Sequence, residues 1–255
     1  MVSSSDDACR WFRRFAQSPR SDRRLICFPH AGGSASYYFP LAQALRSRFE
    51  VLAVQYPGRQ DRRAETCIDT ISELAERIAR ALESLTEVPF AFFGHSMGAT
   101  VAFEVARRLR WTLTGPLCLF ASGRRAPGQI RDERVHLRDD AGLTAELRQA
   151  GGTDHRLLAE EGLMAAVLPA TRADYKAIET YRYLPGPPLD CPITVLVGES
   201  DPKATLDEVS AWASHTTAGF DLRVFPGGHF YLDAHQQAVA DIIDAALQGV
   251  CNGSV

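Results

Sequence analysis

The chain has 255 residues, enough for one large domain with a sizeable core. Its formal net charge of −3 argues against nucleic acid as the main partner. No apolar run approaches the length of a membrane span and no apolar signal core follows the N-terminus, so we expect no membrane association and a cytoplasmic location.

Short apolar runs, typical of buried strands, alternate with helical patterns along most of the chain. An N-terminal arm with Trp11, Phe12 and Phe15 is expected to pack against the sheet. The expected strands are 25–28, 51–54, 90–93, 117–121, 193–197 and 222–225, and the expected helices are 35–47, 71–85, 100–111, 206–214 and 235–248. Such alternation predicts an α/β fold with a mostly parallel, doubly wound sheet that helices cover on both faces.

Residues 125–188 interrupt this alternation, because they contain helical patterns and no strand pattern. The expected helices there are 139–150, 154–168 and 170–181. Their apolar side chains are more numerous than a freely solvated helix pair needs. We therefore predict a helical cap, or lid, at 125–188, inserted into an α/β core formed by 1–124 and 189–255. A bystander insertion packed on the sheet edge is the alternative.

The six cysteines form no C-x-x-C pair and no metal-like cluster with histidine. Cys27 and Cys118 lie inside expected strands, where a free cysteine behaves as a small hydrophobic residue. We therefore expect reduced thiols, and neither a metal ion nor another cofactor.

The segment Gly94-His95-Ser96-Met97-Gly98 joins an expected strand to an expected helix. This is the G-x-S-x-G nucleophile elbow in its required context, strand, sharp turn and helix. The turn lifts the hydroxyl of Ser96 clear of the sheet, and only residues without Cβ fit beside it, at Gly94 and Gly98. Ser96 is therefore the predicted nucleophile, with a chance match as the alternative.

A serine nucleophile needs a base to take its proton and a third group to hold the base. Among seven histidines, His229 follows the last expected strand in a glycine turn and is the predicted general base. His30 and His95 belong to motif turns and are expected to support the site. The predicted acid is Asp201, which lies in the turn after a buried strand, and Glu199 in the same turn is its rival.

The negative charge that develops on a substrate carbonyl oxygen needs preorganised donors. The backbone amide of Met97, the residue after the nucleophile, is one expected donor. The other is expected from the loop after the strand at 25–28, and we assign it to Ala31. The adjacent Gly32-Gly33 pair permits close approach of substrate and backbone, although a tight turn alone would also explain it.

Five motifs in this order resemble the type II (stand-alone) thioesterases of polyketide and nonribosomal peptide synthesis, members of the α/β-hydrolase superfamily. The resemblance covers nearly the whole chain, and the start Trp11-Phe12-Arg13 fits it too. The cap is its least distinctive part. The motifs are Phe28-Pro29-His30-Ala31-Gly32-Gly33, Gln55-Tyr56-Pro57-Gly58-Arg59, Gly94-His95-Ser96-Met97-Gly98-Ala99, Gly198-Glu199-Ser200-Asp201-Pro202 and Gly227-Gly228-His229-Phe230.

The resemblance implies an editing hydrolase. Such enzymes cleave acyl groups from the phosphopantetheine arm of an acyl or peptidyl carrier protein, which frees arms blocked by aberrant or prematurely decarboxylated units. By position, Ser96, Asp201 and His229 take the triad roles, and Ala31 and Met97 the oxyanion roles. A serine acyl-enzyme mechanism follows.

Further candidates for substrate or carrier binding are His30, Gly32 and Arg59. Carrier proteins are usually acidic and their arm carries a phosphate, which guanidinium groups bind well. Arg59, with Arg62 and Arg63, is therefore a docking hypothesis. The alternative is a solvated surface cluster in an arginine-rich chain.

Three other functions remain open at this point. A carboxylester hydrolase or lipase would use the same triad. A catalytically idle binding module is disfavoured because every triad position is filled. A synthase-terminal releasing domain is disfavoured because the chain begins at Met1 with no linker toward a preceding domain. We expect a monomer.

Overall fold

The computed structural model of the chain describes residues 4–16, 22–110, 115–152 and 160–252. Seven strands form one sheet in the order β1-β3-β2-β4-β5-β6-β7. All neighbouring strands run parallel except β1, which lies antiparallel to β3 at the edge. The strands are β1 (Phe12–Ala16), β2 (Arg24–Phe28), β3 (Glu50–Val54), β4 (Phe90–His95), β5 (Leu119–Ser122), β6 (Ile193–Gly198) and β7 (Phe220–Phe225). The predicted α/β fold with a mostly parallel sheet is confirmed.

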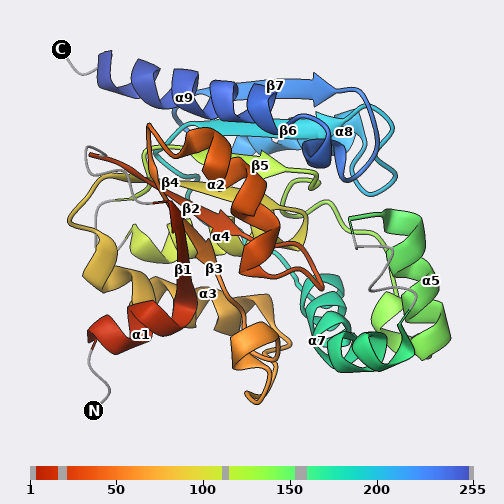
Figure 1. Ribbon diagram of the computed structural model, residues 1–255. Coiled ribbons are helices and arrows are strands. Elements are labelled where there is room, and N and C mark those ends of the chain that lie inside the picture. The colour runs from red at the N-terminus through yellow and green to blue at the C-terminus, as the bar shows by residue number, and fades with distance from the viewer. Residues whose placement is uncertain (1–3, 17–21, 111–114, 153–159, 253–255) are drawn as a thin grey trace.

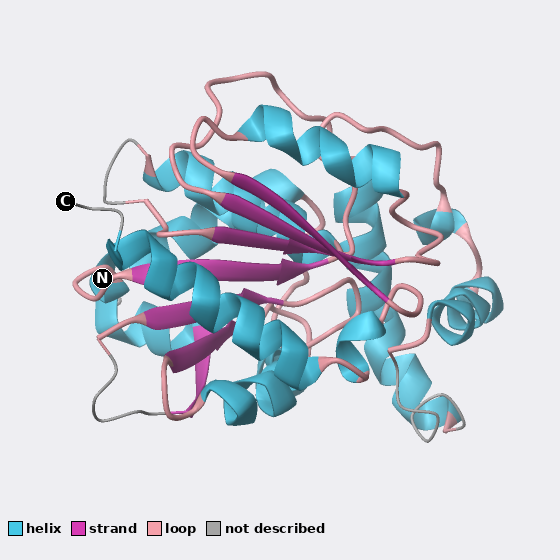
Figure 2. Cartoon of the chain, turned by 90° about the horizontal axis from the view of Figure 1, so that it is seen from above, coloured by secondary structure: helices cyan, strands magenta, loops and turns pink. Residues whose placement is uncertain are grey.

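Helices lie on both faces of this sheet, as the view from above shows (Figure 2). The helices are α1 (Ser4–Trp11), α2 (Phe39–Leu45), α3 (Ile71–Leu82), α4 (Met97–Leu109), α5 (Asp140–Ala150), α7 (Glu161–Glu179), α8 (Leu206–Ser210) and α9 (Gln236–Asn252). Short 3-10 helices are η1 (Ala35–Tyr38), η2 (Gln60–Arg62), η3 (Glu83–Leu85), η4 (Val135–Leu137), η5 (Ala211–His215) and η6 (Tyr231–Asp233). Among the helices of the described ranges, none combines the length and apolar character that crossing a bilayer requires.

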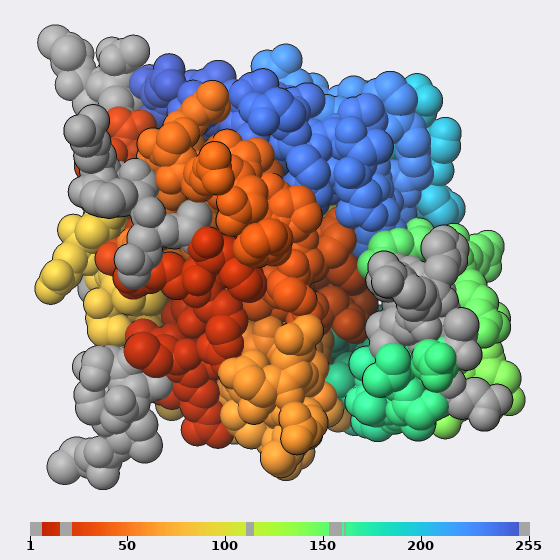
Figure 3. All heavy atoms as spheres, viewed as in Figure 1, coloured from red at the N-terminus to blue at the C-terminus, as the bar shows by residue number. Residues whose placement is uncertain are grey.

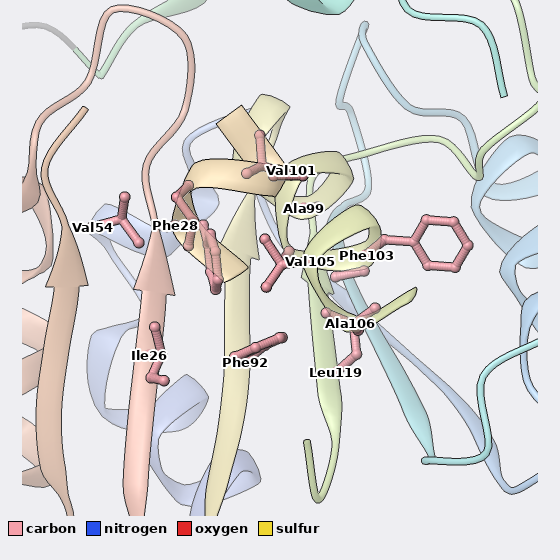
Figure 4. Packing of buried hydrophobic residues seen from close by; sticks show 14 of the residues in the cluster. Ile26, Phe28, Val54, Phe92, Ala99, Val101, Phe103, Val105, Ala106 and Leu119 are labelled. Carbon is pink, nitrogen blue, oxygen red and sulfur yellow. The ribbon is translucent and has the colours of Figure 1, made fainter. Parts of the chain in front are cut away.

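The continuously apolar strands fill two core layers, because successive side chains of a strand point to opposite faces. In β2, Ile26 and Phe28 face the layer shared with α3 and α4, whereas Leu25 and Cys27 face α2 and α9. Figure 4 shows Ile26, Phe28 and other buried residues of the strands beneath the apolar side of α4. This packing fixes the start of α4 over the sheet, where the nucleophile elbow lies.

The segment predicted as a cap forms η4, α5 and α7, which lie together beyond the carboxyl ends of the strands (Figure 1). In the space-filling view these green to teal residues form a lobe at the lower right (Figure 3). The lobe has a small apolar cluster of its own, formed by Val135, Leu143, Leu147, Met164 and Leu168. Leu163 is 53% exposed and lies outside this cluster. The division into core and cap domains stays a prediction.

The helix boundaries of the cap differ from the predicted ones. One helix, α7, runs through Pro169, where the sequence predicted a break between 154–168 and 170–181. The helix continues because its first half packs against α5 and its second half against the core. The start of the predicted helix 154–168 and the end of the predicted helix 100–111 lie outside the described residues.

The N-terminal arm pairs with the sheet as predicted, through β1. The residues before it form helix α1, which their polar composition did not predict. The helix ends at Trp11, whose side chain is buried beneath the guanidinium of Arg62 at 4.4 Å from the ring centre. The arm therefore covers one edge of the sheet.

Candidate active site

Ser96 lies between β4 and α4 with φ 54° and ψ −120°, a backbone conformation that residues with a Cβ rarely adopt. Its neighbours explain how the strain persists. A Cβ on Gly98 would lie 1.9 Å from the carbonyl oxygen of Phe28, and one on Gly94 would lie 2.4 Å from the oxygen of Gly98. The backbone on both sides of Ser96 is therefore packed so closely that only glycine fits at positions 94 and 98.

The structure brings the three predicted triad residues together. The Ser96 hydroxyl lies 3.0 Å from His229 Nε2, and His229 Nδ1 lies 2.8 Å and 3.0 Å from the two carboxylate oxygens of Asp201. With its proton on Nδ1, the imidazole donates to Asp201 and accepts the hydroxyl hydrogen of Ser96. Asp201 also accepts from the backbone amide of Lys203 at 2.8 Å. The rival acid, Glu199, is exposed and makes no such contact.

The turns that carry the acid and the base are bonded to each other. The amide of Ser200 donates to the oxygen of Gly227 at 3.0 Å, and the amide of Glu199 donates to the oxygen of Phe225 at 2.8 Å. A Cβ on Gly198 would lie 2.2 Å from the oxygen of Gly228, so the turns also meet at van der Waals distance. The spacing between Asp201 and His229 is thus set by backbone, not by flexible side chains.

The two predicted oxyanion donors lie in different segments, one directly after Ser96 and the other in the loop after β2. Met97 is the first residue of α4, where helix geometry leaves amide groups without a partner in the preceding turn. Ala31 lines the cavity beside Ser96. Its turn is closed by the amide of Gly33, which donates to the oxygen of His30 at 3.0 Å. The role of both amides as donors to a carbonyl oxygen stays a prediction.

Gly32 has a structural task that the sequence did not indicate. Its φ is +76°, its amide donates to Asp174 at 2.8 Å, and a Cβ there would lie 2.9 Å from the hydroxyl of Thr171. It does not line the cavity. Gly32 therefore lets α7 approach the turn that carries Ala31.

Substituting Gly32→Ala is expected to lower the free energy of unfolding by about 1–2 kcal/mol, because alanine is strained at this φ. Because the Ala31 amide would also shift, kcat should fall more than KM rises. Urea unfolding and steady-state kinetics measure the two effects. The matched control is Gly162→Ala in α7, where a Cβ meets nothing within 4 Å. Equal stability and kcat for both variants would contradict the assignment.

Arg59 is buried, which corrects the docking hypothesis. Its side chain is 8% exposed. The guanidinium forms a bidentate ion pair with the Asp174 carboxylate, with N–O distances of 2.6 Å and 2.9 Å, and also donates to the carbonyl oxygen of Gly33 at 2.9 Å. Arg62 is buried too and pairs with Glu65. Neither guanidinium can reach a partner protein. Arg63 alone of the three is exposed.

His30 is buried and lines the cavity, with Tyr37 and Phe230 packed edge-on against its ring. Burial lowers the pKa of His30 to about 3, so the imidazole is neutral. Its Nδ1 atom has no hydrogen-bond partner in the described part of the chain. His30 therefore forms part of the cavity wall as a neutral ring, and it offers no positive charge that would bind a phosphate.

His95 lies beside the triad and supports it, as its place in the motif suggested. Its Nδ1 lies 2.9 Å from the hydroxyl of Ser122, which in turn lies 2.6 Å from the hydroxyl of Tyr231. The rings of His95 and His229 are 5.1 Å apart. Burial holds the pKa of His95 well below its usual range, so a second positive charge does not oppose the protonation of His229.

The cavity beside Ser96 is small, with a volume of about 40 Å³. Core and cap both line it, since Leu147 and Ala150 come from α5, and Tyr175 and Ile178 from α7. This observation favours the predicted cap over a bystander insertion. Sequence reasoning missed Tyr175 and Asp174, because nothing in a helical pattern shows which face meets the active site.

Comparison with known proteins agrees with this geometry. The sequence matches the Thioesterase domain family over residues 23–247. Thioesterase PikA5 of Streptomyces venezuelae is 50% identical over 244 residues, which cover 94% of this chain and 87% of that protein. The probable cadicidin biosynthesis thioesterase of Streptomyces griseus is 49% identical over 247 residues, which cover 97% of this chain and 68% of that protein.

A solved structure is equally similar. The type II thioesterase BorB from the borrelidin biosynthetic cluster is 48% identical and superimposes with a TM-score of 0.84, over 93% of this chain and 96% of that one. The fold is therefore the α/β-hydrolase fold of these enzymes. On the sequence match and the structural likeness together, the chain belongs to the Thioesterase domain family.

Proposed function

We propose that the chain hydrolyses acyl groups from the phosphopantetheine arm of an acyl or peptidyl carrier protein in polyketide or nonribosomal peptide synthesis. The observation that carries the proposal is the hydrogen-bonded line Ser96–His229–Asp201 at a cavity in a thioesterase-family chain. Relatives named for such pathways, including PikA5 and BorB, support the substrate class.

The geometry suits acyl transfer in two steps. The Ser96 hydroxyl attacks the thioester carbonyl while His229 Nε2 takes its proton, and the backbone amides of Met97 and Ala31 receive the negative oxygen. The carbon–sulfur bond then breaks, and the pantetheine sulfur leaves as a thiol with the proton from His229. Water, deprotonated by His229, attacks the acyl-enzyme and releases the acid and Ser96. Asp201 stabilises the imidazolium in both steps.

The partly covered cavity supports a substrate delivered on a long arm. Cap residues such as Leu147 and Tyr175 line the cavity together with Ser96, so a reacting carbonyl there would lie between core and cap. An extended arm can enter such a space while its carrier protein stays outside. The closest rival is a carboxylester hydrolase with the same triad, and the second is a domain that releases finished products from a synthase.

The test compares kcat/KM for one short acyl group on a carrier protein, on free pantetheine and in a matched oxygen ester, with Ser96→Ala as the blank. We expect the carrier-linked thioester to exceed free pantetheine by at least about tenfold, equivalent to ~1.4 kcal/mol of carrier binding in the transition state. Equal rates with and without the carrier, together with faster ester cleavage, would establish the esterase. Turnover confined to full-length product chains would establish the releasing domain.

A further inference from the structure

Ser122 is the last residue of β5, and both its carbonyl oxygen and its hydroxyl contact residues of the nucleophile elbow. The carbonyl oxygen accepts from the amide of Ser96 at 2.8 Å. The hydroxyl lies 2.9 Å from Nδ1 of His95, the residue opposite Ser122 in the pairing of β4 with β5. Ser122 is fully buried, so water does not compete for these contacts. The mechanism proposed above gives this residue no role.

The hydroxyl of Ser122 also contacts the loop that carries the general base. It lies 2.6 Å from the hydroxyl of Tyr231, which stands two residues after His229. The amide of Tyr231 donates to the carbonyl oxygen of Gly228 at 3.2 Å, so the residues on either side of the base are bonded to each other. The buried ring of Tyr231 stacks on Phe225, with ring centres 4.9 Å apart. A shift of Tyr231 would therefore move His229 with it.

The position of β5 in the sheet explains why these contacts matter. Ser96 follows β4, whereas Asp201 follows β6 and His229 follows β7. Because β5 lies between β4 and β6, the nucleophile and its base come from strands on opposite sides of β5. The turns of the acid and the base are bonded to each other through backbone. Ser122, at the end of β5, bonds both to the nucleophile elbow and to the base loop.

The side chains of Tyr231, Ser122 and His95 form one chain of hydrogen bonds. When the Tyr231 hydroxyl donates to Ser122 and the Ser122 hydroxyl donates to Nδ1 of His95, both hydroxyl hydrogens have acceptors. The reverse direction leaves the hydroxyl hydrogen of Tyr231 without an acceptor among the described residues. Burial raises the pKa of Tyr231 and lowers the pKa of His95, so the phenol keeps its proton and the imidazole stays neutral. Removing one member leaves a buried polar group unpaired.

We propose that Ser122 and Tyr231 are positioning residues, whose hydrogen bond keeps the nucleophile and the general base at the 3.0 Å separation that proton transfer needs. Neither residue lines the cavity beside Ser96, so they act through the triad and not on the substrate. The inference rests on the proposed function, in which Ser96 attacks and His229 takes its proton. A misplacement of about 1 Å can lower a reaction rate on the order of 10²-fold. Loss of this hydrogen bond should therefore lower kcat and leave KM nearly unchanged.

The main variant, Tyr231→Phe, removes the hydroxyl and keeps the ring that stacks on Phe225. We expect it to lower kcat for acyl-pantetheine hydrolysis by at least about fivefold, with KM within about twofold of the wild type. Ser122→Ala, which also removes the partner of His95 Nδ1, should lower kcat by at least about tenfold. Because both variants break the same contact, the double variant should be no more than about twofold slower than Ser122→Ala, whereas independent losses would multiply to about fiftyfold.

The matched control is Tyr181→Phe, which removes the 2.8 Å hydrogen bond from another tyrosine hydroxyl to Glu104 and does not line the cavity beside Ser96. Each variant loses one hydrogen bond, so both should shift the midpoint of urea unfolding similarly. Only Tyr231→Phe should lower kcat by more than about twofold. An unchanged kcat in Tyr231→Phe, equal losses of kcat in the two variants, or losses that multiply in the double variant would overturn the inference.

The rate at which a fluorophosphonate probe labels Ser96 separates this inference from the proposed function, because the probe is neither a thioester nor bound to a carrier protein. Wild-type protein that is labelled but hydrolyses no thioester would contradict the proposed function. Labelling of Tyr231→Phe at least about fivefold slower than that of the wild type would still support the positioning role, since the probe also needs an activated hydroxyl. Equal labelling rates in the two proteins would overturn it.

Discussion

Ser96→Ala is expected to lower kcat for thioester hydrolysis by a factor between about 10⁴ and 10⁶, because the triad acts as a unit and residual catalysis comes only from the oxyanion donors and binding. The fold should survive, since alanine and serine meet the same backbone restriction at φ 54°. Steady-state kinetics on an acyl-pantetheine thioester measure the loss, and labelling with a fluorophosphonate probe should disappear with it.

The matched control is Ser200→Ala, which removes an exposed hydroxyl beside the catalytic acid. The amide of Ser200, which donates to the oxygen of Gly227, remains in this variant. We expect kcat to stay within about twofold of the wild type, since surface changes away from the chemistry have small effects. A Ser96→Ala protein that keeps a tenth of wild-type activity would place the nucleophile elsewhere.

Asp174→Ala is expected to lower the free energy of unfolding by about 3–5 kcal/mol, because removing one partner of a buried ion pair leaves the other charge uncompensated. Arg59 would lose both of its hydrogen bonds to the Asp174 carboxylate, and the amide of Gly32 would lose its acceptor. Asp174 is fully buried, so water cannot replace the carboxylate readily. Urea unfolding followed by circular dichroism measures the change, read from the midpoint at constant slope.

The control for this prediction is Asp140→Ala, which breaks the pair between Arg172 and Asp140 in the same region. That pair is solvent-exposed, with Asp140 75% exposed, so we expect a loss of at most about 1 kcal/mol. Equal losses of unfolding free energy in Asp174→Ala and Asp140→Ala would mean that the buried ion pair contributes no more to stability than the exposed one. Reduced kcat in Asp174→Ala is also expected, because the turn that carries Ala31 loses its support from α7.

The sheet and the triad could be predicted because their signals are local. A buried parallel strand needs a continuous apolar run, and an elbow needs Gly94 and Gly98 beside Ser96. Asp201 and His229 follow strands, and parallel strands bring their carboxyl ends to one edge. Sequence alone could therefore say which residues would meet, although they lie far apart along the chain.

The contacts between residues 125–188 and the rest of the chain could not be predicted, because they depend on how surfaces that lie far apart in the sequence meet. Arg59 was interpreted as a surface residue, because it stands close to Arg62 and Arg63 in an arginine-rich chain. Its partner, Asp174, lies 115 positions away in a helix whose polar face resembles any solvated one.

The continuous path of α7 through Pro169 has one more consequence. Proline has no amide hydrogen, so the carbonyl oxygen of Ala165 lacks the bond that would normally reinforce that turn. The hydroxyl of Thr171 donates to the carbonyl oxygen of Val167 at 2.9 Å and ties this turn from the side chain. The weak point separates the stretch that carries Met164 and Leu168, packed with α5, from the stretch that carries Asp174, tied to Arg59. The end that packs with α5 and the end tied to Arg59 are therefore joined by a turn with one backbone hydrogen bond fewer than a regular helix has.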